Sequence, residues 1–290
     1  MSSPTPAPAT DRIAFIGGGN MASAIVGGLL RTGWAAGRID VVEPLDAARE
    51  RLVRDFGVRT HAQAGPFLAA AEVIVWAVKP QTFKQATQAV RPHAGAALHL
   101  SVAAGIRSDS IVRWLGSARV VRSMPNTPAL IGRGMTGLFA RDGVSAAHKA
   151  RVEALLAPTG DLLWVEQESD LDTVTALSGS GPAYVFFFIE AMTQAGVDMG
   201  LSAAQAQQLA VATFVGAAEL AQTSGDSPAV LRARVTSPGG TTQAAITSMQ
   251  AEQLAQRFAR ALQAARARAR ELGDELGDKF GGQSGGELGP

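Results

Sequence analysis

The residues best suited to chemistry lie in an uncharged loop late in the chain, with the sequence Ser237-Pro238-Gly239-Gly240-Thr241-Thr242. A helical pattern follows directly, so this loop should lead into a helix N-terminus. The first amides of a helix have no partner within the helix, and the helix dipole is positive at that end. We therefore expect these amides and the two threonine hydroxyls to bind a small anion such as a carboxylate. The alternative is an ordinary capped helix.

A second glycine-rich loop, Gly179-Ser180-Gly181-Pro182, precedes a long apolar helical pattern. Pro182 would occupy the first turn of that helix, where a missing N–H costs nothing. This loop is a second candidate for an anion site, and an ordinary helix start is again the alternative.

A third glycine cluster follows a short apolar run near the start of the chain. It has the form G-x-G-x-x-A, and its residues are Gly17, Gly18, Gly19, Asn20, Met21 and Ala22. In a dinucleotide-binding turn the first glycine permits the tight turn, the second lets a pyrophosphate approach the backbone, and the alanine lets the helix pack closely on the strand. The helix N-terminus would then hold the phosphates. A plain turn is the alternative.

An acid at the end of the second predicted strand supports the dinucleotide interpretation. Glu43 follows Gly19 by 24 residues, which is near the spacing at which a carboxylate accepts hydrogen bonds from the adenosine ribose hydroxyls. The alternative is a surface acid that happens to precede Pro44.

The elements that must position these residues alternate along the first half of the chain. Apolar runs predict strands at residues 12–16, 39–43, 73–78, 97–102 and 119–124, with helical patterns such as 46–56 and 83–90 between them. Alternating strands and helices indicate an α/β fold with a Rossmann-type, doubly wound parallel sheet, whose ligands bind beyond the carboxyl ends of the strands. Asn20 and Asn126 are the only asparagines, and both fall on such strand-end loops. We expect functional side chains there, with a turn or capping role as the alternative.

The second half of the chain is predicted to be mainly helical. Late strands at 134–140 and 161–165 extend the sheet, and only helical patterns follow residue 171. We expect a dinucleotide-binding Rossmann domain at 12–168 and an all-α substrate-binding and dimerisation domain at 169–273. A disordered lead-in (1–11) and a disordered tail (274–290) would flank them. Because the helix over 183–192 is apolar nearly all round, we expect it to be buried in a homodimer; a self-sufficient bundle is the alternative.

Composition excludes several classes of protein. A net charge of +1 gives no reason to expect nucleic acid as a partner, and the absence of cysteine excludes disulfides and thiolate metal sites. The four histidines show no metal-ligand spacing, so we expect no metal. No apolar run reaches the ~18 residues of a membrane span, and the first ten residues lack the features of a signal peptide. We expect no membrane association and a cytoplasmic location.

A nicotinamide site beside a small anion site indicates hydride transfer. Reduction of a ketone needs a general acid at the carbonyl oxygen, and the candidate loops offer only Lys79. A cyclic imine that arrives protonated already accepts hydride. It needs only a hydroxyl to hold its N–H.

Five motifs together give the chain a close resemblance to the pyrroline-5-carboxylate reductases, from about residue 12 to residue 272. They are Gly17-Gly18-Gly19-Asn20-Met21, Val78-Lys79-Pro80, Met124-Pro125-Asn126-Thr127-Pro128, Gly179-Ser180-Gly181-Pro182-Ala183-Tyr184 and Thr236-Ser237-Pro238-Gly239-Gly240-Thr241-Thr242. The resemblance implies reduction of 1-pyrroline-5-carboxylate to L-proline with NADPH or NADH, the last step of proline biosynthesis. It also implies an interlocked homodimer, which in this family often assembles into a ring of dimers.

The resemblance also assigns roles to residues of this chain. Gly240, Thr241 and Thr242 would hold the substrate carboxylate, with the Thr242 hydroxyl near the ring nitrogen as the catalytic group. We expect Ser180 and Gly239 in the same site. The cofactor would be lined by Gly17, Gly18, Gly19, Asn20, Met21, Ala22, Glu43, Ala77, Val78, Lys79, Pro80, Ala103, Ala104, Gly105, Met124, Pro125 and Asn126.

The chain departs from the family pattern after the second strand. The family commonly has small polar or basic residues there, which accept a 2′-phosphate, whereas this chain has Glu43-Pro44-Leu45. An acid would repel the phosphate and favour NADH, although Arg49 one helical turn on could swing in, so both cofactors stay open. The rival functions are a 3-hydroxyacid dehydrogenase, which would need a catalytic lysine in the second half, and a redox-sensing protein without turnover.

Overall fold

The computed structural model describes residues 11–281, with side chains described as far as residue 277. The chain forms two compact units. One, here called the sheet unit, comprises the described residues up to Gly179 together with those from Ala265 onward; the other, the helical unit, is Ser180–Ala264. Among the described residues no helix is long and apolar enough to cross a bilayer.

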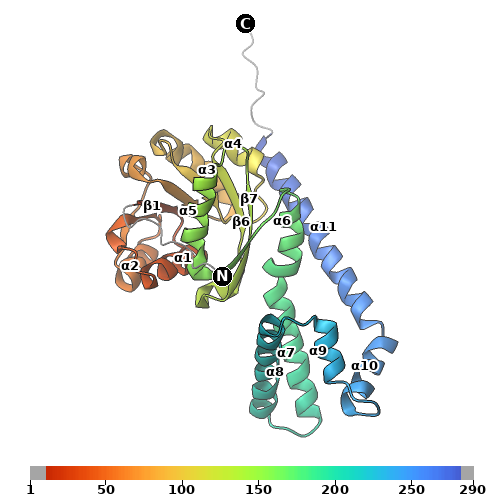
Figure 1. The fold of residues 1–290 in the computed structure, drawn as a ribbon. Helices are drawn as coiled ribbons and strands as arrows, with labels where there is room; N and C mark the ends of the chain where they lie inside the picture. The colour runs from red at the N-terminus through yellow and green to blue at the C-terminus, as the bar shows by residue number, and fades with distance from the viewer. Residues whose placement is uncertain (1–10, 282–290) are drawn as a thin grey trace. The chain divides into compact units, whose positions relative to one another are not determined.

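An eight-stranded sheet forms the centre of the sheet unit (Figure 1), in the order β3-β2-β1-β4-β5-β6-β7-β8. Strands β1 to β6 run parallel to one another, β7 pairs antiparallel with β6, and β8 pairs parallel with β7. This confirms the predicted doubly wound fold and the late strands that extend it. The strands are β1 Ile13–Ile16, β2 Ile39–Val42, β3 Arg59–His61, β4 Val73–Trp76, β5 Leu98–Ser101, β6 Val120–Met124, β7 Gly134–Ala140 and β8 Gly160–Trp164.

Helices cover both faces of this sheet. One apolar cluster joins Phe15 to Leu29 and Leu52, and a second joins Ile16 to Phe83 and Ile111. Successive strand residues belong to opposite clusters, as the two-residue period of a strand requires, so the strands are buried on both faces. The α-helices of this unit are α1 Asn20–Arg31, α2 Asp46–Phe56, α3 Pro80–Val90, α4 Ser108–Leu115, α5 Ala146–Leu156 and α6 Asp170–Val174. Short 3₁₀ turns lie at Ala36–Arg38, Pro66–Ala70, Arg91–His93, Thr127–Ile131 and Ala157–Thr159.

The helical unit consists of antiparallel and crossing helices. They are α7 Gly181–Asp198, α8 Ala203–Thr223, α9 Pro228–Arg234, α10 Thr241–Ala251 and the first part of α11 Leu254–Gly281. Helices α7 and α8 approach so closely that a Cβ on Gly196 would lie 2.8 Å from Ala206 Cβ. Phe258 of α11 packs edge-on against Tyr184 and Phe188. Most other apolar side chains of α7 and α8 are exposed, among them Phe186, Phe187, Leu209, Val215 and Leu220.

Two predicted boundaries are wrong within the described residues. The expected disordered tail begins at residue 274, but α11 continues to Gly281. Asp274 accepts a 2.7 Å hydrogen bond from Arg107 Nη2, and Leu276 lies against the loop at Gly105, so the sheet unit holds this segment in place. At the other end, Asp11 is 3% exposed and paired with Arg151 rather than disordered. Residues 1–10 and 282–290 of the expected disordered ends lie outside the described part of the chain.

Candidate active site

Gly17 occupies the point where the strand order of the sheet reverses, between β1 and β4. Its φ of +99° suits glycine, and a Cβ there would lie 2.6 Å from the carbonyl oxygen of Ala77 after β4. Its amide donates to Val42 O at 2.8 Å. Any side chain would therefore force apart the crevice in which such sheets bind their ligands.

The N-terminus of α1 is open beside this turn. Gly19 is the N-cap residue and makes no side-chain cap, and a Cβ placed on it would meet no atom within 4 Å. Asn20 is exposed, Met21 is half-buried, and Ala22 is fully buried under the sheet, as close helix–strand packing requires. Free amides at the positive end of a 12-residue helix, with open space in front of them, fit the pyrophosphate of a dinucleotide.

Glu43 reaches back to this glycine turn from the end of β2. Its Oε2 accepts a hydrogen bond from the Gly18 amide at 2.9 Å, and its Oε1 accepts one from the Leu45 amide at 3.0 Å. Nη1 of Arg49 donates to the carbonyl oxygens of Glu43 and Pro44, each at 2.8 Å. The carboxylate is thus fixed beside the glycine turn.

The remaining predicted cofactor residues follow the next three parallel strands. Ala77, Val78, Lys79 and Pro80 follow β4, and Lys79 is the N-cap residue of α3. Ala103, Ala104 and Gly105 follow β5, where Gly105 has a φ of +73°. Met124 ends β6, and Pro125 and Asn126 come next. Because β1, β4, β5 and β6 are parallel neighbours, the sheet brings all these loops to its carboxyl edge.

The side chain of Asn126 is fully engaged in tying this edge together. Its Nδ2 donates to the carbonyl oxygen and the hydroxyl oxygen of Ser178, both at 3.2 Å. Its Oδ1 accepts from the Met135 amide at 2.9 Å. Asn126 was expected to line the cofactor; in the structure its side chain fixes the loop after β6, a role that only long-range contacts reveal.

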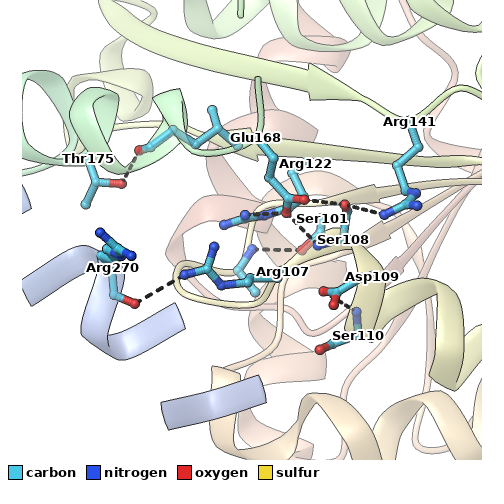
Figure 2. A network of polar contacts seen from close by, with 12 residues as sticks. Ser101, Arg107, Ser108, Asp109, Ser110, Arg122, Arg141, Glu168, Thr175 and Arg270 are labelled. Atoms are coloured by element: carbon cyan, nitrogen blue, oxygen red, sulfur yellow. Dashed lines mark hydrogen bonds and ion pairs between the residues drawn. The ribbon is translucent and has the colours of Figure 1, made fainter. Parts of the chain in front are cut away.

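A polar network that the sequence did not predict lies between β6 and the segment before α6 (Figure 2). Glu168 Oε1 accepts from Arg122 Nη1 and from the Ser108 amide, both at 2.6 Å, and Oε2 accepts from the Ser108 hydroxyl at 2.5 Å. Arg141 Nη1 also donates to that hydroxyl, at 3.1 Å. Burial raises the pKa of Glu168, but Arg122 and the hydrogen bonds from Ser108 and Arg122 outweigh it and hold the pKa below its usual value. The available sequence signal was Arg122, a charge inside an apolar strand that needs a partner.

This network fixes the loop that carries Ala103, Ala104 and Gly105. Ser108 begins α4 directly after that loop, and Glu168 holds both its amide and its hydroxyl. From the opposite side, Arg107 Nη2 donates to Asp274 and to the Arg270 carbonyl oxygen of α11. The loop is therefore held from both sides.

The helical unit contains the loop of residues 237–242 at the start of α10. Gly239 has a φ of +72°, and Gly240 is the N-cap residue without a side-chain cap. The side-chain oxygen Oε1 of Gln243 accepts a hydrogen bond from the Gly239 amide at 2.5 Å. This side chain therefore caps the turn and not the helix. Within the described residues, the amides of Thr241, Thr242 and Gln243 have no hydrogen-bond partner. The capped-helix alternative is therefore wrong here, and the predicted open N-terminus is confirmed.

The second glycine loop differs from the expectation. Residues Thr175–Gly179 form a π-helical turn that joins α6 to Ser180, whose backbone is itself in the α-helical region. A Cβ on Gly179 would lie 2.4 Å from Met124 Cε, so a larger residue there would have to displace the end of that methionine side chain. The start of α7 at Gly181 therefore continues a preceding helical turn and is not a free helix N-terminus. The Ser180 hydroxyl makes no hydrogen bond within the described residues and stays available.

Residues 11–281 contain no candidate metal centre. No group of three or more His, Asp or Glu side chains there is placed to hold a metal ion.

Comparison with known proteins gives consistent matches over nearly the whole chain. Residues 168–272 match the family described as pyrroline-5-carboxylate reductase dimerisation, and residues 12–105 match the family described as NADP oxidoreductase coenzyme F420-dependent. The pyrroline-5-carboxylate reductase of Pseudomonas aeruginosa is 45% identical over 257 residues, which is 88% of this chain and 94% of that protein. The enzyme of the same name from Pasteurella multocida is 40% identical over 87% of this chain and 94% of its own.

Solved structures agree. A pyrroline-5-carboxylate reductase from Coxiella burnetii has a TM-score of 0.86 and 39% identity, covering 91% of this chain and 98% of its own. The pyrroline carboxylate reductase of Plasmodium falciparum, solved with NADP bound, has a TM-score of 0.82 and 26% identity, covering 92% and 100%. Because relatives that are 40–45% identical match most of this chain and most of their own length, the chain belongs to the pyrroline-5-carboxylate reductase family.

Proposed function

We propose that this chain reduces 1-pyrroline-5-carboxylate to L-proline by hydride transfer from NADH or NADPH, the last step of proline biosynthesis. The observation that carries the proposal is the open N-terminus of α10, where three consecutive amides have no partner among residues 11–281 and no side-chain cap. Such an end binds a carboxylate without a cationic side chain.

The cofactor supplies the hydride when bound, and the carboxyl edge of the sheet supplies the place to hold it. Gly17 and Gly19 leave room for the pyrophosphate at the start of α1, and Glu43 offers a carboxylate for the adenosine ribose. The loops after β4, β5 and β6 would line the remainder, with the residues named above.

The substrate would bind through Gly239, Gly240, Thr241 and Thr242, with Ser180 contributing a hydroxyl. The Thr242 side chain is half-buried, whereas that of Thr241 is exposed. We assign Thr242 as the catalytic contact, because its hydroxyl oxygen can accept the N–H of a protonated ring. A protonated imine already carries its proton on the ring nitrogen, so hydride can add to the neighbouring carbon without a general acid to protonate that nitrogen.

We propose a homodimer built through the helical unit. Its exposed apolar side chains on α7 and α8 are too many for a free surface, and the family match over residues 168–272 is to a dimerisation region. Further assembly into a ring of dimers and a cytoplasmic location are proposals that rest on the family resemblance and the sequence.

The rival 3-hydroxyacid dehydrogenase reaction needs a catalytic lysine in the second half of the chain, and the helical unit Ser180–Ala264 contains none. Lys149 lies on α5 of the sheet unit with its Nζ 5.1 Å from the centre of the Trp164 ring. Lys279 belongs to the segment whose side chains are not described. A redox sensor without turnover leaves the open α10 terminus unexplained.

The test is oxidation of NADH and NADPH by the purified protein with 1-pyrroline-5-carboxylate as substrate. Turnover is expected, and a missing rate with both cofactors would reject the proposal. For Thr242→Ala we expect kcat/KM to fall by a factor that corresponds to about 1–3 kcal/mol, the cost of one polar contact in a closed site. Thr247→Ala removes a hydroxyl from the same helix, five residues from Thr242, and should leave kcat/KM within about twofold.

A further inference from the structure

We infer that Glu43 makes this enzyme select NADH over NADPH and that Arg49 is not a ligand for a 2′-phosphate. The inference rests on the cofactor site of the proposed function. It concerns the one position after β2 where the two cofactors differ, since the fold places the adenosine ribose at the end of this strand.

The carboxylate of Glu43 is held in place by the backbone. The Gly18 amide donates to Oε2 at 2.9 Å and the Leu45 amide donates to Oε1 at 3.0 Å. A carboxylate has about four acceptor positions, so lone pairs remain for two ribose hydroxyls. Because its two oxygens accept from the Gly18 and Leu45 amides, the carboxylate cannot move away from a phosphate without weakening these hydrogen bonds.

A 2′-phosphate carries close to two negative charges at neutral pH. Placed beside a fixed carboxylate, it would meet like charge where a ribose hydroxyl would donate a hydrogen bond. The same group therefore favours one cofactor and opposes the other. Attraction of one cofactor together with repulsion of the other produces a large ratio between the affinities for NADH and NADPH.

Arg49 is the cation nearest in the chain to Glu43 that could reverse this preference, and both of its terminal nitrogens already have partners. Nη1 donates to the carbonyl oxygens of Glu43 and Pro44, and Nη2 is paired with Asp46. The side chain is only 20% exposed. To reach a phosphate it would have to leave two carbonyls and a carboxylate, and one of those carbonyls belongs to Glu43 itself.

The surface around Arg49 offers no excess of positive charge. A shallow depression there is lined by two acids and two arginines, of which Arg54 is paired with Asp55. Sites that accept a 2′-phosphate usually present an arginine whose fork is free for the phosphate oxygens. Here the charges of the depression balance.

The experiment measures the dissociation constants of NADH and NADPH by isothermal titration calorimetry, without substrate. For the wild type we expect NADH to bind at least about tenfold more tightly, which corresponds to about 1.4 kcal/mol. Glu43→Gln keeps the length of the side chain and an acceptor for the Gly18 amide but removes the charge. Its affinity for NADPH should rise and its affinity for NADH should fall, so that the ratio narrows to about threefold or less. Glu166→Gln removes the same charge from an exposed position after β8, outside this depression, and should leave the ratio unchanged.

The ratio of the two dissociation constants distinguishes cofactor selection by Glu43 from structural support of the glycine turn by Glu43. If Glu43 only stabilised the turn, both Glu43→Gln and Glu43→Ser would weaken the two cofactors equally. An unchanged ratio in both variants, or a wild type that binds NADPH as tightly as NADH, overturns the inference while leaving the proposed reaction intact. A selective loss of NADPH affinity in Arg49→Ala would overturn the statement about Arg49. Failure of the wild type to bind either cofactor would reject the proposed function itself.

Discussion

Arg122 and Glu168 are joined across 46 residues of chain, with Arg122 Nη1 2.6 Å from Glu168 Oε1. The arginine lies on a central strand and the glutamate precedes the last helix of the sheet unit before Ser180. The pair and its Ser108 hydrogen bonds thus fasten the loop after β5 to the rest of the sheet.

Glu168→Gln should lower the free energy of unfolding by about 2 kcal/mol or more. The change leaves Arg122 as a largely buried charge without its counter-ion, and such losses are costly. Urea unfolding at pH 7.5 measures this loss of stability. The control is Glu166→Gln, which changes an exposed neighbour. Because the pKa of Glu168 is lowered in the fold, its stabilisation is present above the ordinary carboxyl pKa of 4.5 and is lost as the pH falls through the folded value. Equal stabilities of the two variants would contradict the assignment.

His99 should make the free energy of unfolding depend on pH over a higher pH range than Glu168 does. Burial, with a smaller effect of Arg119, lowers the pKa of His99 from 6.5 to about 4. The unfolded chain therefore binds a proton at a pH where the folded chain does not, and stability is full above pH 6.5 and falls as the pH drops toward 4. From pH 7.5 to pH 5 we expect a loss of about 2 kcal/mol from this group.

His99→Asn is the variant that tests this. Trp76 Nε1 donates to His99 Nδ1 at 3.3 Å, and an asparagine oxygen can take that acceptor role. The variant should be less stable at pH 7.5, because a ring is lost from a packed interior. Its stability should nevertheless change about 2 kcal/mol less than that of the wild type between pH 7.5 and pH 5. A parallel pair of pH profiles would show that His99 does not titrate in this way.

Gly17→Ala should damage cofactor binding more than any other small change at the sheet edge. The added Cβ would lie 2.6 Å from Ala77 O, and the φ of +99° adds backbone strain of about 1–3 kcal/mol. We expect the dissociation constant of NADH to rise at least about tenfold. Gly37→Ala is the matched control, since a Cβ there meets no atom within 4 Å. An unchanged affinity for NADH in Gly17→Ala would show that the cofactor does not bind at this turn.

Phe187→Glu should weaken the dimer. Phe187 is 64% exposed on α7 of a single chain, and a buried, unpaired carboxylate in an apolar interface is strongly unfavourable. Size-exclusion chromatography with light scattering should show a shift toward monomer. Val53→Glu replaces an equally apolar, exposed residue of α2 in the sheet unit and should leave the assembly unchanged. An unaltered dimer in Phe187→Glu would show that the interface does not include this face of α7.

Local patterns were sufficient for most of the fold and for part of the site. Residues 46–56 were predicted as a helix and residues 134–140 as a strand, and both have those bounds in the structure. These segments carry their own periodicity and end signals, so neighbours in the sequence decide their structure. The open start of α10 was also predicted, because glycine and threonine at a helix start leave its amides free.

The positions that were missed depend on distant partners. The segment from residue 274 to 281 has the composition of a disordered tail, yet Arg107 holds Asp274 from 167 positions away. Asn126 was singled out by its rarity, but its role follows from Ser178 and Met135, which no local pattern connects to it. The π-helical turn before Ser180 was also missed, and in it Gly179 packs against Met124 of a distant strand.

The sequence by itself determined the family, most of the strands and helices, and the two backbone features that suit phosphate and carboxylate, since glycine content and helix starts are properties of adjacent residues. It did not predict the edge strand β3. The tertiary structure alone decided what holds those features: the Glu168 network, the Asn126 tether, the return of α11 to the sheet unit, and the fixed carboxylate of Glu43. The reason is that a buried charge or amide is stabilised only by the partner that folding brings to it, and the chain carries no local record of which partner that is.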